Sequence, residues 1–418
     1  MPLSRVAGVT DGNGVKMVYG YDKLDHVVSI AKADGTGLAA YTYDETGNRT
    51  IARYAGATFT NSYERRLLTR VTRNAGSVTQ VATYHYDRPD GTDTGQVQSR
   101  TDVTGTADNT YDGFGRLTKA GSRTYGYDNA GNITAGDGHT YTVDNADQMT
   151  KIDNVTVGYD GAGNLTTTDP GGQAHYSDTN QRTSVTSSSG TLFTAGYDTL
   201  DQTQPASITE RVGSGDVTHV FTRTALGISR TVDNGAATTY AHDVDGKLTG
   251  LVDAAGKHHN AITDYQGSVI ALIDDTGAVT GTYGYTPYGF NTGITGPAGT
   301  SNRLRWIGSY QLAGSEYLTG YRHYSPVYAR FTQPDPTGQE ANTYAYGQGD
   351  PVNRTDLAGA ASAGCVNAGA GAIFTLLGTA ATWAATGATG GITAGLAVGS
   401  TFAAVGAVGG AVLACRNG

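Results

Sequence analysis

A short unit that recurs along the first half of the chain constrains the fold more than any other sequence feature. Each copy has Tyr-Asp, two linking residues, Gly, then Asn or Arg and an apolar residue. The clearest copies begin at Tyr43, Tyr111, Tyr127 and Tyr159, and weaker ones begin at Tyr21, Tyr86, Tyr141, Tyr197 and His242. Internal repeats of this kind indicate a fold built from copies of one supersecondary unit.

Each unit predicts a β-hairpin. In the copy at Tyr43, the Asp44 carboxylate would stabilise a type I turn, Gly47 would take the left-handed backbone position, and Asn48 would begin the next strand. One hairpin buries little surface, so each copy needs its neighbours for stability. The repeats therefore predict an all-β chain in which consecutive hairpins form a long antiparallel ribbon.

The composition favours sheets that face water on at least one side. Glycine accounts for 61 of the 418 residues, roughly twice its usual share. Tyrosine is the main large apolar residue, with 27 copies against 8 Phe and 2 Trp. Tyrosine rings can pack in cross-strand pairs while their hydroxyls reach water. We therefore expect extended sheets rather than one compact apolar core.

The charge balance and the scarcity of metal ligands argue against several functions. The chain has 28 Lys and Arg against 37 Asp and Glu, a net charge of −9, and no run of basic residues, so nucleic acid is not an expected partner. Its two cysteines and scattered histidines have no metal-site spacing, and we expect no metal or cofactor. The first residues lack the apolar stretch of a signal peptide, so we expect the protein to reach a secreted or cell-surface location by a non-classical route.

Residues 317–359 separate the repeats from an apolar tail, and they are dense in ionisable and turn-forming groups. The ordered motifs of this segment are Gly320-Tyr321-Arg322, Arg330-Phe331, Pro334-Asp335-Pro336-Thr337-Gly338, Tyr344-Ala345-Tyr346, Pro351-Val352-Asn353 and Asp356-Leu357-Ala358-Gly359. Further motifs precede it at Thr263-Asp264, Gly284-Tyr285-Thr286-Pro287-Tyr288-Gly289 and Arg305-Trp306-Ile307-Gly308. Two acidic turns on either side of short strands could meet if the segment folds back as a hairpin.

These motifs resemble the core of RHS (rearrangement hotspot) and YD-repeat proteins, and the resemblance covers residues 1–359. It implies YD/RHS repeats over 1–240, an RHS repeat-associated core over 241–359, and a separate tail over 360–418. In that family the repeats stack into a hollow spiral shell. We therefore expect a long hairpin ribbon that curls into a partial shell, followed by a small apolar α-helical tail.

The resemblance also implies that the core is an intramolecular aspartyl protease. Its motif positions identify Asp335 and Asp356 as the carboxylate pair, Arg330 as the charge partner, and Gly359 and Ala360 as the cleavage region, with the cut after Ala360. Two carboxylates that share one proton can divide the roles of base and acid in peptide hydrolysis.

The sequence departs from the family pattern at two positions of this site. Leu357 replaces a proline that would restrict Asp356, and Ala360 replaces a leucine at the expected cut. The alternative reading is that Asp335 and Asp356 only begin turns, since Asp before Pro or before x-Gly is a common turn signal.

The tail carries no Asp, Glu, Lys, Arg or His between Ala360 and Cys415. Glycines spaced by four residues from Gly387 to Gly399 form a glycine zipper, the arrangement that lets apolar helices approach closely in a bilayer. Two helices over about 366–387 and 392–414 would each be about 33 Å long, enough to span a membrane. Such a transmembrane hairpin would bring Cys365 near Cys415, where a disulfide could form. The composition also fits a low-complexity remnant.

Together these features predict the C-terminal part of an RHS-type toxin, in which autoproteolysis releases a short membrane-active effector. Its expected partners are the rest of a longer RHS shell or another chain that completes it, a target membrane bound by the tail, and an immunity protein. The alternative is a non-catalytic surface or cell-wall-associated protein that binds glycans and uses the tail as a membrane anchor.

Overall fold

The computed structural model describes residues 7–364 except 11–13, 77, 103–104, 169–170, 199–202, 244, 339 and 361–362. Within these ranges the regular secondary structure is almost entirely β-strand, as predicted, with one short α-helix and two 3-10 helices. In every sheet each strand pairs in antiparallel fashion with the next strand along the chain. Predicted features of residues 365–418, including the helical hairpin and the Cys365–Cys415 pair, lie outside the described residues.

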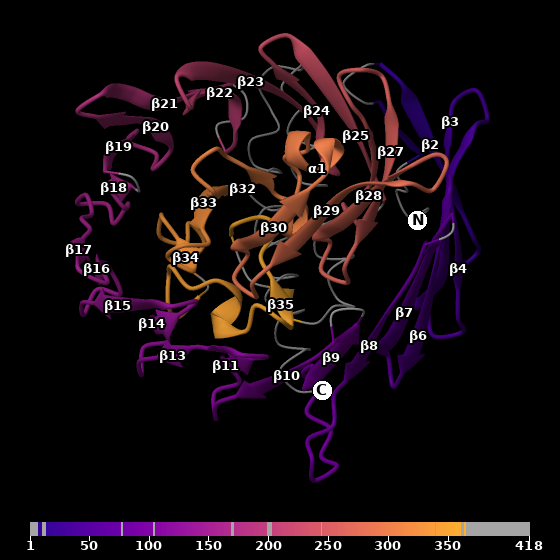
Figure 1. Cartoon of the computed structure of the whole chain (residues 1–418), viewed down its shortest axis with the longest axis horizontal. Coiled ribbons are helices and arrows are strands. Elements are labelled where there is room, and N and C mark those ends of the chain that lie inside the picture. The colour runs from indigo at the N-terminus through magenta and orange to yellow at the C-terminus, as the bar shows by residue number, and fades with distance from the viewer. Residues whose placement is uncertain are drawn as a thin grey trace, which may run out of the picture.

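Three large sheets form the wall of a shell (Figure 1). The first has 12 strands: β1 Gly8–Thr10, β2 Lys16–Tyr21, β3 Val27–Lys32, β4 Gly37–Tyr43, β5 Arg49–Tyr54, β6 Ala57–Glu64, β7 Leu67–Ala75, β8 Val78–His85, β9 Ser99–Asp102, β10 Gly105–Tyr111, β11 Leu117–Ala120 and β12 Arg123–Thr124. The second has five: β13 Gly126–Tyr127, β14 Ile133–Gly136, β15 His139–Val143, β16 Met149–Ile152 and β17 Val155–Thr156.

The third sheet has 13 strands: β18 Thr167–Thr168, β19 Gly172–Tyr176, β20 Arg182–Ser187, β21 Gly190–Tyr197, β22 Pro205–Val212, β23 Gly215–Thr224, β24 Gly227–Asp233, β25 Ala236–His242, β26 Leu248–Val252, β27 His258–Thr263, β28 Val269–Asp274, β29 Val279–Tyr285 and β30 Asn291–Thr295. β25 crosses residue 240, and the division of the chain at residues 240 and 359 stays a prediction.

The remaining elements lie inside this wall in Figure 1. They are α1 Pro297–Ser301, the 3-10 helices η1 Trp306–Gly308 and η2 Gly347–Gly349, the four-stranded sheet of β31 Tyr310–Gln311, β32 Tyr317–Thr319, β33 Arg322–Ser325 and β34 Arg330–Phe331, and the pair β35 Arg354–Thr355 and β36 Ala363–Gly364. Within the described part of the chain, no helix is long and apolar enough to cross a membrane.

The repeat turns have the predicted chemistry. Asp44 Oδ1 accepts the backbone N–H groups of Thr46 and Asn48, each at 2.9 Å, and Gly47 has a φ of 84°. The Asn48 side-chain amide donates to the other Asp44 oxygen at 2.9 Å. With the Thr46 hydroxyl at 2.8 Å, one carboxylate therefore satisfies four donors of its own turn, and this is why Asp and Gly recur at fixed positions in each hairpin.

The tyrosine hydroxyls differ from the expectation. Instead of reaching water, those of Tyr43, Tyr176 and Tyr285 each donate to a backbone carbonyl of an earlier part of the ribbon at 2.8 Å. A hydrogen bond satisfies the polar end of the side chain while the ring is buried. Each tyrosine therefore ties its hairpin to an earlier one.

The first and third sheets meet and close the wall. Gly76 lies so near Gly277 that a Cβ on Gly277 would be 2.5 Å from the Gly76 Cα. The Arg49 guanidinium pairs with the buried Asp243 carboxylate across the same boundary, at 2.9 Å. The apolar residues of this seam are Ala57, Ala75, Ile262, Ala271 and Ile273. The prediction of a curled shell is thus confirmed, and residues about 200 apart in sequence form its closure.

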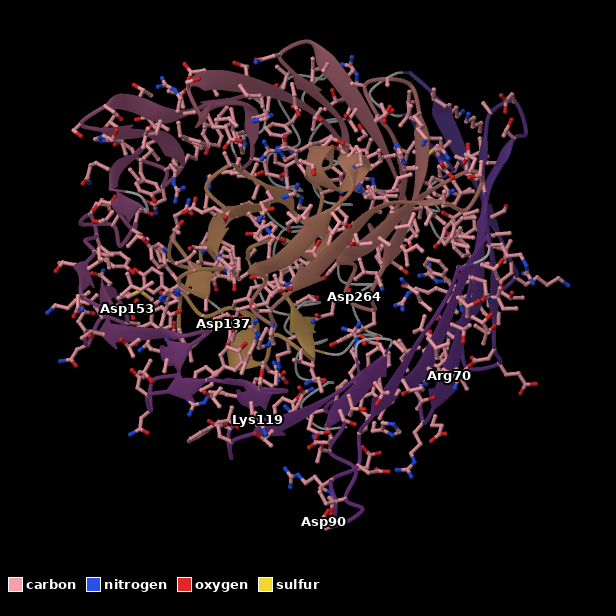
Figure 2. The ribbon with its side chains drawn as sticks, viewed as in Figure 1. Arg70, Asp90, Lys119, Asp137, Asp153 and Asp264 are labelled. Carbon is pink, nitrogen blue, oxygen red and sulfur yellow. The ribbon has the colours of Figure 1, made fainter. Side chains whose placement is uncertain are left out.

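An aromatic cluster organises the interior segment. Trp306 stacks on Tyr324 with ring centroids 5.0 Å apart, and the cluster comprises Trp306, Ile307, Tyr317, Tyr324, Phe331 and Tyr346. The Tyr344 hydroxyl joins this segment to the wall by donating to the Gly163 carbonyl at 2.7 Å. Figure 2 shows side chains filling the space between wall and interior, while Asp90 lies at the tip of a loop that projects outward.

Candidate functional site

The backbone before the predicted cut is held in one register. The Tyr321 N–H donates to the Ala358 carbonyl at 2.9 Å. Gly320 has a φ of 66°, and a Cβ there would lie 2.3 Å from the Ala358 oxygen. Gly359 has a φ of 61°, and its Cβ would lie 2.1 Å from the Thr319 oxygen. Both positions need glycine because a side chain would clash with backbone as well as strain it.

Beyond this point the chain turns back on itself. β36 pairs with β35, so that Arg354 lies opposite Gly364 and Thr355 opposite Ala363. Ala360 therefore sits in the connection between two paired strands and is buried, with 5% of its surface exposed.

Asp356 lies at the amide of Ala360. Its side chain is fully buried, and its Oδ1 accepts the Ala360 N–H at 3.1 Å. Its Oδ2 accepts from Nη2 of Arg322 at 2.9 Å. The carboxylate thus joins a buried guanidinium to the residue at which cleavage is predicted.

Arg322 organises the surrounding backbone. Its Nε donates to the Gly359 carbonyl at 2.6 Å and its Nη1 to the Thr343 carbonyl at 2.9 Å. The guanidinium carbon lies 3.5 Å from the centre of the Phe331 ring. A planar guanidinium with several fixed partners holds Asp356 and Gly359 in one orientation.

The charges around Arg322 are predominantly negative. Burial lowers the pKa of Arg322, and the charges of Asp356, Asp335 and Glu340 oppose that effect. Asp335 and Glu340 are each 8% exposed and Asp356 is 1% exposed. Three buried carboxyl groups therefore surround one buried guanidinium. Ionising all three carboxyl groups at once would have a high free-energy cost.

Asp335 approaches Ala360 from the opposite side through Thr337. Its Oδ1 accepts the Thr337 N–H at 3.0 Å. The Thr337 Oγ1 lies 2.9 Å from Asp335 Oδ1 and 2.8 Å from Oδ2. The same hydroxyl lies 2.8 Å from the Ala360 carbonyl oxygen. Asp335, Thr337 and the carbonyl oxygen of the peptide bond that cleavage would break are therefore in continuous contact.

Arg330 lies elsewhere. Its Nη2 donates to the Asp147 carbonyl at 2.6 Å, and its guanidinium carbon lies 4.7 Å from the centre of the Tyr344 ring. Burial lowers the pKa of Arg330. The arginine that contacts Asp356 is Arg322, which sequence reasoning did not select because both arginines occur in neighbouring motifs and only the fold distinguishes them.

Thr337 and Glu340 were also missed by the sequence reasoning. Thr337 had a usable signal, since it follows Asp335 at the turn position where a hydroxyl reaches the carboxylate. Glu340 had none, because its place beside Arg322 depends on the path of the whole loop. Within the described ranges, no group of three or more His, Cys, Asp or Glu side chains could hold a metal ion.

Comparisons with known proteins agree with this fold. The family model described as Teneurin YD-shell matches residues 95–298. Among solved structures, TcdB2-TccC3-Cdc42 is 17% identical over 88% of this chain and 21% of its own, with a TM-score of 0.71. TcdB2-TccC3 is 17% identical over 84% of this chain and 21% of its own, with a TM-score of 0.69.

A third structure, a Photorhabdus luminescens Tc holotoxin pore with a mutated TccC3, is 16% identical over 85% of this chain and 20% of its own, with a TM-score of 0.65. The chain thus spans about a fifth of the length of the solved chains that it resembles. No curated protein matched it.

The repeat turns, the sequential antiparallel sheets and these matches define a YD-repeat β-shell. The chain resembles the YD-repeat shell proteins over residues 95–298, and its fold is that of the Tc toxin structures.

Proposed function

We propose that this chain is the C-terminal part of an RHS-type toxin shell and that its core cuts its own backbone after Ala360. One observation carries the proposal: Asp356 accepts the N–H of Ala360, while Asp335 contacts the carbonyl of the same residue through Thr337. Two buried carboxyl groups that lie on the N–H and the carbonyl of one residue can provide both the base and the acid that hydrolysis requires. The substrate needs no binding step because it is part of the site.

Intact-mass analysis of the purified protein tests the cut. The wild type should yield a body of residues 1–360, whereas Asp335→Asn and Asp356→Asn should stay uncut. Asp160→Asn is the matched control, since Asp160 also begins a turn and accepts the N–H groups of Ala162 and Asn164 at 2.9 Å. We expect this variant to be cut like the wild type.

Other outcomes would contradict the proposal. An uncut wild type, or cleavage of both core variants, would favour turn-forming roles for the two aspartates and the alternative of a non-catalytic binding shell. The fraction cut should not change with protein concentration, because each chain carries its own substrate. A fraction that rises with concentration would indicate cleavage between molecules.

The shell and tail have proposed partners as well. Support for a partner chain or a longer shell comes from the matched structures, of which this chain covers about a fifth and which contain TcdB2 with TccC3.

For the freed segment 361–418 we propose a target membrane, on the basis of its uncharged composition and its glycine spacing. Liposomes that retain their dye in the presence of this peptide at micromolar concentration would exclude the membrane role. We also propose that the protein is exported by a non-classical route and that an immunity protein is among its partners.

A further inference from the structure

We propose that Thr337 is a catalytic residue whose hydroxyl passes a proton between Asp335 and the Ala360 carbonyl oxygen, while Asp356 activates the attacking water. This inference rests on the proposed self-cleavage and adds to it a third residue and an assignment of acid and base. It follows from the number of acceptor oxygens around the single hydrogen of the Thr337 hydroxyl, and from the positive charge of Arg322 beside Asp356.

The Thr337 hydroxyl has more acceptor oxygens around it than it can serve. Its Oγ1 lies within 2.9 Å of both Asp335 oxygens and 2.8 Å from the Ala360 oxygen, yet a hydroxyl carries one hydrogen. If Asp335 were ionised, its oxygens would still accept the N–H groups of Thr337 and Glu340, but three acceptor oxygens would compete for the one hydroxyl hydrogen. If the Asp335 carboxyl carries a proton, it donates to Oγ1, and the Thr337 hydrogen is free to point at Ala360. The second arrangement satisfies all three residues.

Asp356 is in the opposite situation. Its oxygens accept from Arg322 Nη2 and from the Ala360 N–H. Arg322 is 2% exposed, and a neutral Asp356 would leave its buried positive charge poorly compensated. Asp356 is therefore the ionised member and the base, and Asp335 is the protonated member and the acid.

The steps balance with one water. The water oxygen bonds to the Ala360 carbonyl carbon as Asp356 takes a water proton. The carbonyl oxygen takes the Thr337 hydrogen, and the Asp335 proton replaces it. Asp356 then gives its proton to the peptide nitrogen, the C–N bond breaks, and a hydroxyl of the intermediate returns its proton through Thr337 to Asp335. The products are a carboxyl group on Ala360 and an amine on the next residue, with both aspartates restored.

The wall contains the same Asp-x-Thr turn without this third contact. Thr46 and Thr276 place their hydroxyls 2.8 and 2.6 Å from Asp44 and Asp274, in exposed turns. Thr337 differs because its hydroxyl also meets a carbonyl from a separate part of the chain. A purely structural threonine would need only the contact within its own turn.

The test is a time course of cleavage during cell-free synthesis of the full chain, read by intact mass. Thr337→Val keeps the shape of the side chain and removes the hydroxyl, so the rate should fall about 10²- to 10⁴-fold, the usual contribution of a positioned acid. Thr337→Ser should restore most of the rate. Thr276→Val, the matched control, should cut like the wild type.

Cleavage of Thr337→Val at the wild-type rate would overturn the relay while leaving self-cleavage intact. An uncut wild type would instead overturn the proposed function.

A measurement on the wild type alone covers the case in which Thr337→Val does not fold. The cleavage rate is followed in mixtures of H₂O and D₂O. A curved dependence on the deuterium fraction supports more than one proton moving together, as the relay requires. A linear dependence indicates a single moving proton and would overturn it.

Discussion

At the scale of single residues, the most consequential side chain of the site is Arg322. It is the only arginine that an ion pair joins to Asp356 among the described residues, and both side chains are almost fully buried. Burying an ion pair is costly, and removing one partner leaves the other charge without compensation. Arg322 therefore supports the stability of the core as well as the orientation of Asp356.

Arg322→Met should destabilise the protein by about 3–5 kcal/mol, the usual cost of breaking a buried pair. Arg65→Met is the matched control, because Arg65 pairs with Asp93 at 2.9 Å while remaining 77% exposed. Such a surface pair contributes about 0–1 kcal/mol. Urea titration of uncut chains that carry Asp335→Asn measures both changes. Similar losses for the two variants would contradict the role given to Arg322.

Sequence reasoning identified part of this site. Asp335 and Asp356 were selected by motif, and the structure brings both of them to Ala360. The choice of Arg330 as the charge partner was wrong, because Arg322 is the arginine that contacts Asp356, and this depends on which faces of two short strands point toward the loop. The roles of the two aspartates stay predictions until cleavage is measured.

At the scale of elements, a histidine links strands β22–β24 of the wall to β31 of the interior. His219 contacts Asp233 at 2.7 Å, Glu210 at 3.1 Å and the Tyr310 hydroxyl at 3.0 Å. Burial alone would lower the pKa of His219, but the hydrogen bonds and charges of Asp233 and Glu210 raise it to about 9. The folded state therefore favours the protonated, positively charged form of His219.

Stability should consequently depend on pH. Because the folded-state pKa is raised above the ordinary value near 6.5, the contribution of His219 is complete below that value and is lost as the pH rises through about 9. Melting temperatures recorded from pH 6 to pH 10 should fall over this window in the wild type. They should fall less in His219→Gln. Equal slopes for the two proteins would show that this link does not control stability.

The hairpins themselves were predictable, because Asp, Gly and Asn form each turn within a few residues. The partners of the tyrosine hydroxyls were not, since a bond from Tyr43 to the Val27 carbonyl depends on how successive hairpins stack. The same limit applies to the interior segment, where Tyr344 meets Gly163 across a wide sequence separation.

At the scale of the whole molecule, the closure of the wall depends on backbone contact. No repeat motif marks Gly76 and Gly277 as neighbours, and sequence reasoning predicted curling without locating this seam. A side chain on Gly277 would press against the Gly76 backbone, which cannot move aside as the end of a flexible side chain could.

Gly277→Ala should therefore open the seam and lower the melting temperature, and amide exchange should rise in β6, β7, β28 and β29. Gly235→Ala is the matched control, because Gly235 has a φ of 92° against 86° for Gly277 but has nothing within 4 Å of its Cβ position. Both variants carry backbone strain, and only one carries a clash. Equal effects would show that strain, and not closure, is responsible.

Strand order in the three wall sheets follows chain order throughout, each strand lying beside its immediate predecessor. A ribosome delivers the chain from its N-terminus, and local pairings form faster than distant ones. The wall can therefore assemble progressively during translation, with its last strands arriving just before the interior segment. Ala360 reaches Asp335 and Asp356 only after the described wall strands have been synthesised, so the cut would report that this part of the shell has been made.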